Sequence, residues 1–359
     1  MSCSKSGTMC IQIEMIAILI LGFLSISCAY LAKNQKFHVA FLFSFIFIAV
    51  FLAIRYDFGN DYMAYLKMHK EIQQDTILGS YYEIGWVVLN KIVTNFFFLI
   101  ISLSVLNCLI YFRFINIYVP SEYWWLAVFI YVFNTNFMLI QSSTMRQTVA
   151  ILIFIYSIRY IINRRFLPFI ACCCLAFSFH SSALILFPVY WCTYIKLEHV
   201  FIKIFIVFLF VFIYIAGKYL ISFAHEAIML VFTGRYDHFL DEVSQGGFFN
   251  ISVYTSLLIL ILIMDKKASY ITKIFNKLSI LALFSFPIAT MVPMAARIGY
   301  YFFPATLITY TFIAKNFSSI QRSIFILLLI SIIIVRFISV VFSDIWREHF
   351  INYKTIYNI

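Results

Sequence analysis

The sequence is poor in glycine, proline and charged residues. Among its 359 residues are ten glycines and six prolines, and only 11% of the residues are charged, whereas 64% are hydrophobic. A soluble domain of this length needs a larger polar surface, so the composition excludes one. The apolar runs are of helix length and lack the alternating segments of about ten residues that membrane β-barrels show. The sequence therefore predicts an all-α, polytopic integral membrane protein.

Patterns that bind metals, nucleotides and cofactors are also missing. All cysteines except Cys3 and Cys10 fall within expected spans, where packing as small apolar residues is their ordinary role. The sequence has no CxxC or His/Cys ligand spacing, no P-loop and no glycine-rich dinucleotide fingerprint. We therefore expect no metal and no cofactor.

The apolar runs predict about 12 transmembrane helices, or at least about ten, in a single membrane domain over residues 1–359. Two connectors, about 55–92 and 217–250, are much longer than the others and are expected to carry interfacial helices. The expected spans are 11–32, 37–54, 93–112, 122–140, 145–162, 166–180, 181–195, 200–216, 251–264, 277–294, 298–314 and 323–341.

Basic residues are concentrated in the short connectors, for example at Arg164, Arg165, Lys266 and Lys267. By the positive-inside rule these connectors are cytoplasmic, so both long connectors face the outside. The net charge of +11 is accordingly a signal of topology, and we expect no nucleic-acid partner.

Arg146 and His180 stand inside otherwise continuous apolar sequence, on either side of a basic turn at 163–165. At about 1.5 Å per residue, the chain descends about 24 Å from Arg146 to Ile162 and returns about 22 Å from Arg165 to His180. The hairpin therefore brings both side chains to one level of the membrane, which indicates a functional site. For either residue alone the alternative is local: an arginine extending to the headgroups, or a histidine bonded to a backbone carbonyl.

Four arginines, Arg55, Arg146, Arg235 and Arg297, recur at outer helix ends, where positive residues are disfavoured. The planar guanidinium offers paired donors that match phosphate oxygens, so such a set suits a diphosphate at the membrane surface. For Arg55 the alternative is an ion pair with a neighbouring aspartate. The nearby tyrosines also fit an aromatic belt.

Six stretches, taken in order over nearly the whole chain, resemble the EpsG-type, Wzy-like polymerases of O-antigen and exopolysaccharide. In that pattern Asn60 replaces a smaller residue such as threonine. The six stretches are Arg55…Gly59-Asn60-Asp61-Tyr62…Tyr65, Glu83-Ile84-Gly85, Met145-Arg146-Gln147…Ala150, Leu175-Ala176…His180-Ser181-Ser182-Ala183-Leu184, Arg235-Tyr236 and Arg297…Tyr300-Tyr301.

This resemblance implies a glycosyltransferase that moves a glycan from an undecaprenyl-diphosphate carrier to the non-reducing end of a second lipid-linked repeat unit. The implied base for the acceptor hydroxyl is His180 or, as second candidate, Asp61, and Arg146 acts on the leaving diphosphate. The alternative role of His180 is to donate a hydrogen bond to the diphosphate. The diphosphate contacts are Arg55, Arg146, Arg235 and Arg297. Glu83 orients the sugar or an arginine, and the other residues that bind or orient the sugar are Tyr62, Gln147, Tyr236 and Tyr300.

The resemblance further implies a bacterial cytoplasmic (inner) membrane location, an active site on the extracytoplasmic face, and work beside a flippase and a chain-length regulator. Three alternatives stay open. A glycan ligase would use much the same chemistry. A flippase or transporter would show inverted repeats and ionisable residues near mid-membrane. A dolichol-type glycosyltransferase would need a tighter pair of carboxylates than Asp57 and Asp61.

Overall fold

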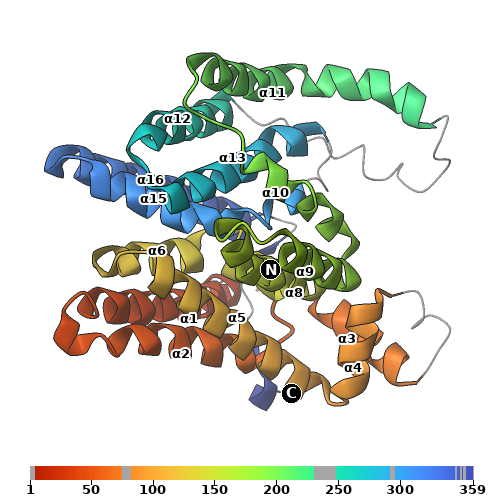
Figure 1. Cartoon of the computed structure of the whole chain (residues 1–359). Helices are drawn as coiled ribbons and strands as arrows, with labels where there is room; N and C mark the ends of the chain where they lie inside the picture. The colour runs from red at the N-terminus through yellow and green to blue at the C-terminus, as the bar shows by residue number, and fades with distance from the viewer. Residues whose placement is uncertain are drawn as a thin grey trace. The chain divides into compact units, whose positions relative to one another are not determined.

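The computed structural model describes residues 5–74, 82–229, 248–291, 296–343, 346–347, 350 and 353–358. These residues are helical almost throughout, which confirms the all-α prediction (Figure 1). The chain divides into two compact units. Unit 1 comprises Met1–Ile158, Ile170–Leu184 and Ala314–Ile359, and unit 2 comprises Arg159–Phe169 and Ile185–Ile313.

Unit 1 holds the helices of both chain ends. They are α1 (Lys5–Leu31), α2 (Ala40–Ala53), α3 (Tyr62–Gln73), α4 (Ile84–Ile92), α5 (Phe96–Tyr118), α6 (Trp124–Phe133), α7 (Met138–Ser143), most of α8 (Met145–Ile162), most of α9 (Phe166–Phe179) and α16 (Ser319–Val341). Unit 2 holds α10 (Val189–Cys192), α11 (Val200–Met229), α12 (Phe248–Met264), α13 (Tyr270–Met291), α14 (Ala296–Gly299) and most of α15 (Phe303–Asn316).

Within the described part of the chain, five helices are long and apolar enough to cross a membrane. They are α5, α8, residues Val200–Gly217 of α11, residues Tyr270–Ala289 of α13, and α16. Shorter apolar helical stretches cover Ile16–Leu31, Ala40–Ala53, Phe166–Phe179 and Ser181–Cys192. The protein is therefore an integral membrane protein, as expected, while the number of about twelve spans stays a prediction.

Two expected spans are interrupted. The run 122–140 divides into α6 and α7, because the Asn134 side chain accepts a hydrogen bond from the backbone N–H of Asn136 (3.1 Å) and so competes with the helical pattern. The run 181–195 is a 3-10 helix, Ser181–Leu186, followed by the single turn of α10. Pro188 stands between them and lacks the N–H that a continuous helix needs there.

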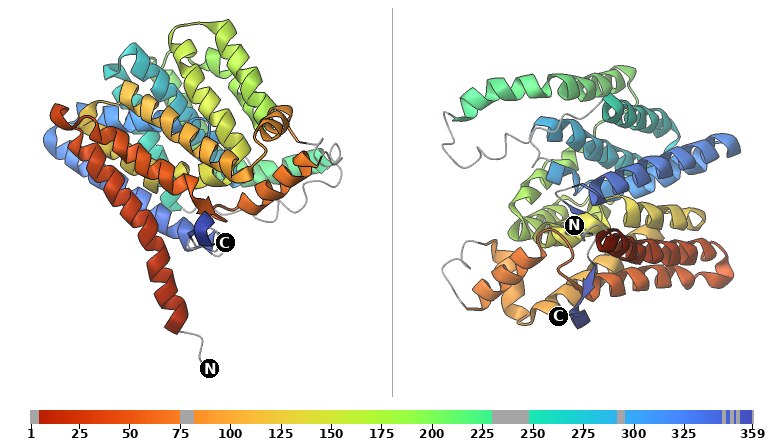
Figure 2. Two further views of the ribbon diagram at one scale, coloured as in Figure 1. Left: turned by 90° about the horizontal axis from the view of Figure 1, so that it is seen from below. Right: turned by 180° about the vertical axis from the view of Figure 1, so that it is seen from behind.

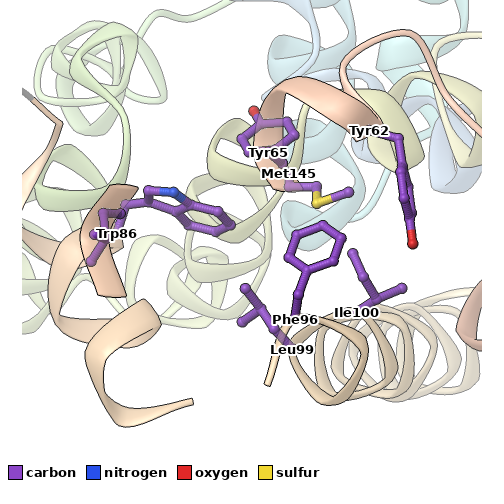
Figure 3. Close-up of a cluster of buried hydrophobic side chains, with 8 residues drawn as sticks. Tyr62, Tyr65, Trp86, Phe96, Leu99, Ile100 and Met145 are labelled. Atoms are coloured by element: carbon purple, nitrogen blue, oxygen red, sulfur yellow. The ribbon is translucent and has the colours of Figure 1, made fainter. Parts of the chain in front are cut away.

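The first long connector folds into two helices, α3 and α4, that cover the N-terminal end of α5. Buried residues of α3 recur at Tyr62, Tyr65, His69 and Ile72, which is the spacing of one helix face. Figure 3 shows how Tyr62 and Tyr65 meet Trp86 of α4, the start of α5, and Met145 at the start of α8. In the second connector, α11 continues to Met229, and residues 230–247 lie outside the described residues.

The C-terminal segment folds back onto the start of the first connector. Strand β2 (Lys354–Thr355) pairs antiparallel with β1 (Arg55–Tyr56), with Arg55 opposite Thr355 (Figure 2). The ring of Tyr353 stacks on Phe51 at 4.1 Å and also contacts Phe58. The turn that follows α2 is therefore held from the far end of the sequence.

In unit 2, connectors that were expected to share the cytoplasmic side come together. Arg164 donates to the Thr193 hydroxyl (3.2 Å), Lys277 donates to the Thr193 carbonyl, and Lys273 pairs with Glu198 (2.8 Å). Three connectors that are distant in sequence thus meet at one end of this unit, as the charge distribution predicted.

Candidate functional site

A tight turn after α2 grips the junction between α7 and α8. Gly59 has a φ of +108°, which glycine adopts without strain, and a Cβ there would lie 3.1 Å from the Ser142 carbonyl oxygen. The backbone N–H of Asn60 donates to the Ser143 hydroxyl (3.1 Å), and Nη2 of Arg55 donates to the Ser142 carbonyl (3.3 Å). The turn therefore fixes the two residues that end α7.

This junction places Arg146 in the first turn of α8. The helix begins at Met145, whose side chain is buried against α3, α4 and α5. The backbone N–H of Arg146 donates to the Tyr65 hydroxyl of α3 (3.4 Å). The first N–H groups of a helix have no partner within the helix, so this bond satisfies one of them. Arg146 is thus fixed by its backbone as well as by its side chain.

Glu83 precedes α4 and is brought to α9 by a close helix contact. A Cβ on Gly85 would lie 2.6 Å from the Ser178 hydroxyl and 2.8 Å from its carbonyl oxygen, distances that side chains essentially never show. Only glycine therefore allows α4 to approach the last turn of α9 this closely. His180 follows that turn directly, so Gly85 places Glu83 beside it.

Glu83 joins the two residues of the hairpin. Its Oε2 accepts a short hydrogen bond from Nη1 of Arg146, and its Oε1 lies 3.4 Å from Nδ1 of His180. The three side chains are 16–22% exposed, so the cluster is partly buried yet reachable. Arg146 and His180 thus lie on either side of one carboxylate, so each has a side-chain partner, while their shared depth in the membrane stays a prediction.

The electrostatics of the cluster keep Glu83 ionised. Burial alone would raise the pKa of its carboxyl, but hydrogen bonds from His180 and the backbone, together with the charge of Arg146, lower that pKa to about 2. Glu83 is therefore an acceptor at every physiological pH. Because a carboxylate only accepts, Nδ1 of His180 carries the hydrogen that faces it, and the tautomer of the ring with this arrangement has its lone pair on Nε2.

Two tyrosine rings flank the Arg146 guanidinium. Its central carbon lies 6.0 Å from the ring centre of Tyr65 and 5.9 Å from that of Tyr82. The Tyr82 hydroxyl donates to Glu71 (2.7 Å), which fixes that ring. Nε of Arg146 is buried and has no hydrogen-bond partner among the described residues. The guanidinium thus retains a donor for a further acceptor.

Other expected site residues of unit 1 are packed inside it. Tyr62 is fully buried and donates to the Arg55 carbonyl (3.4 Å), and Gln147 is also buried. Arg55 is 4% exposed and forms no ion pair among the described residues, so the local pair with aspartate is not present. Asp61 precedes α3 and is half-buried.

The remaining expected residues belong to unit 2 or lie outside the described residues. In unit 2, Arg297 lies on the short helix α14 and Tyr300 follows it; both are half-buried. Arg235 and Tyr236 lie outside the described residues. Their assignment to the diphosphate and the sugar stays a prediction.

Sequence reasoning missed the two tyrosines that flank Arg146. Tyr65 belongs to the conspicuous stretch after Arg55, but an outer tyrosine is equally typical of an aromatic belt. The available signal was its position in the helix. Tyr65 lies one turn after Asp61 and on the same buried face of α3 as Tyr62. Tyr82 adjoins Glu83 and carried no periodic signal at all.

Comparison with known proteins gives one match. The family model described as EpsG family matches residues 38–355, which is nearly the whole chain. A search of curated proteins and a search of solved structures find no match. The matched range includes both the Arg55 turn and the C-terminal strand that pairs with it.

The close approach at Gly85 can be tested by substitution. Gly85→Ala forces α4 away from Ser178 and therefore separates Glu83 from His180, so we expect a loss of activity of at least about tenfold, comparable to one misplaced catalytic group. Ile84→Ala is the matched control, because its side chain is largely exposed on the same helix. Polymer formation per folded molecule, measured on purified protein, is the readout. Equal activity of both variants would show that this contact does not position the site.

Proposed function

Because the chain belongs to the EpsG family, a family of Wzy-like polymerases, we propose that it is a membrane polysaccharide polymerase whose active site is the Arg146–Glu83–His180 cluster. Its donor is a glycan on an undecaprenyl-diphosphate carrier, and its acceptor is the non-reducing-end hydroxyl of a second lipid-linked repeat unit. The observation that carries the proposal is the single carboxylate shared by an arginine and a histidine.

The chemical step requires a base and a stabilised leaving group. The acceptor hydroxyl attacks the anomeric carbon of the donor sugar, its proton passes to Nε2 of His180, and the bond between that carbon and the diphosphate oxygen breaks. The electron pair leaves with the diphosphate. Glu83 stabilises the imidazolium that forms, since its Oε1 faces Nδ1. Asp61 is the second candidate base.

Arg146 stabilises the leaving diphosphate. Nη1 is held by Glu83 while the side chain as a whole is partly exposed, so the guanidinium is oriented before the ligand arrives. Tyr82, which is partly exposed, offers an aromatic face beside it for the adjoining sugar, whereas Tyr65 is buried and supports the guanidinium from within. The resemblance to the family implies that Arg235 and Arg297 also contact the diphosphate. Arg55 takes no direct contact, because its side chain is buried.

The proposed topology has about 12 spans and puts the cluster on the extracytoplasmic face of a bacterial inner membrane. The charge of the short connectors supports this orientation, since the basic ends that meet in unit 2 belong to the cytoplasmic side. A flippase would then supply lipid-linked units to the outer leaflet, and a chain-length regulator would act on the product.

A glycan ligase is the main alternative, since it would use the same leaving group and base. Surface polysaccharide from a deletion strain, separated on a gel, distinguishes the functions. Chains of one repeat unit are the result that the proposal predicts. Long chains that are not attached to their final acceptor would indicate a ligase, and the absence of surface glycan would indicate a flippase.

The role of Arg146 is tested by separating charge from geometry. Lysine keeps the charge and loses the planar pair of donors, so Arg146→Lys should be severely impaired and Arg146→Ala should lose about 10²–10³ in rate. The matched control is Arg113→Lys, since Arg113 is exposed on α5. His180→Ala should lose less activity as the pH rises, because hydroxide partly replaces the base.

Polymer length is measured against the amount of folded protein extracted from the membrane. A merely structural role would lower the amount of protein and leave the activity per molecule intact. Near-normal activity of Arg146→Ala per molecule contradicts the proposal.

A further inference from the structure

A small cavity lined by both apolar and polar side chains lies inside unit 1, beside the junction of α7 and α8. Its volume is about 20 Å³, which holds one occupant of roughly the size of a water molecule. It is closed by the end of α2, by α5, and by the junction of α7 and α8. Its polar lining residues are Arg55, Ser104, Asn107, Gln141, Ser142 and Thr148.

The cavity contains a buried charge that has no counter-ion among residues 5–74, 82–229 and the other described ranges. Arg55 is 4% exposed, Nη2 donates only to a backbone carbonyl, and Nε has no hydrogen-bond partner among the described residues. Burial lowers the pKa of the guanidinium to about 10, so it remains a cation at neutral pH. An isolated buried cation is strongly destabilising unless an anion compensates it.

The amides of Asn107 and Gln141 can both turn donors toward the cavity. As placed, Nδ2 of Asn107 donates to Tyr131 and Nε2 of Gln141 donates to Tyr111, which leaves both amide oxygens without partners. Rotating each amide by 180° exchanges its nitrogen and oxygen. Each tyrosine hydroxyl then donates its hydrogen to an amide oxygen, and the amide N–H groups join Nε of Arg55 as donors that lack acceptors.

We propose that this cavity binds a small monovalent inorganic anion, of which chloride is the physiological representative. A cationic guanidinium and two amide groups supply donors, and the described lining residues supply no carboxylate. A diphosphate is too large for a space of this size. The anion neutralises Arg55, whose guanidinium holds the Ser142 carbonyl at the end of α7, and so stabilises the segment that presents Arg146. This site is separate from the proposed reaction, and it stands whether or not the protein is a polymerase.

The test is thermal unfolding of the purified full-length protein, followed by tryptophan fluorescence, as chloride replaces gluconate at constant ionic strength. A ligand that binds only the folded state raises the midpoint with the logarithm of its concentration, here by about 2 °C for each tenfold increase above the dissociation constant. Bromide should act in the same way, and its anomalous scattering should place it beside Arg55. A midpoint that is indifferent to chloride and bromide overturns the proposal.

Two variants add a negative charge inside the cavity that can neutralise Arg55 in place of a bound anion. Gln141→Glu and Asn107→Asp each put a carboxylate in the cavity, so each should remove the dependence on chloride. Gln321→Glu, which adds the same charge at an exposed position of α16, is the matched control and should keep the dependence. If chloride stabilises the Gln141→Glu and Asn107→Asp proteins as much as the unmodified protein, the anion binds elsewhere and the proposal is wrong. Should one variant fail to fold, the other and the halide titration still decide.

Discussion

The ion pair between Arg146 and Glu83 is the interaction on which the site depends, because each partner would be destabilising in its place without the other. A partly buried arginine at a helix start needs a counter-charge, and a carboxylate next to an apolar helix needs donors. Glu83 also contacts His180, so the ion pair becomes a cluster of three side chains. The site is therefore organised before any ligand binds, which is the condition under which fixed charges contribute most to catalysis.

Much of the family pattern holds backbone segments together and does not face the ligand. Gly59 and Asn60 fix the end of α7, and Gly85 allows α4 to approach α9. The C-terminal strand then pairs with the turn that contains Arg55, so the beginning and the end of the matched range close on each other. Such a frame explains why short motifs spread over the whole chain converge on three side chains.

The sequence was sufficient for the fold class and for the hairpin of α8 and α9, because long apolar runs and basic turns are strong local signals. It was not sufficient for the breaks at Asn134 and before Pro188, since one polar residue or proline barely alters the hydrophobicity of a long run. Arg146, His180 and Glu83 were all identified as candidates. Their contact could not be predicted, because it depends on how a connector folds back onto two helices, and Tyr82 had no sequence signal.

In the proposed reaction Glu83 orients Arg146, and the oriented guanidinium binds the diphosphate of a lipid-linked donor. The most direct measurement is a structure of the protein in lipid with a non-reacting lipid-diphosphate donor bound. The account predicts a diphosphate oxygen within hydrogen-bond distance of Arg146 and the acceptor side open to Nε2 of His180. A diphosphate bound elsewhere, with Arg146 still paired only to Glu83, would contradict it.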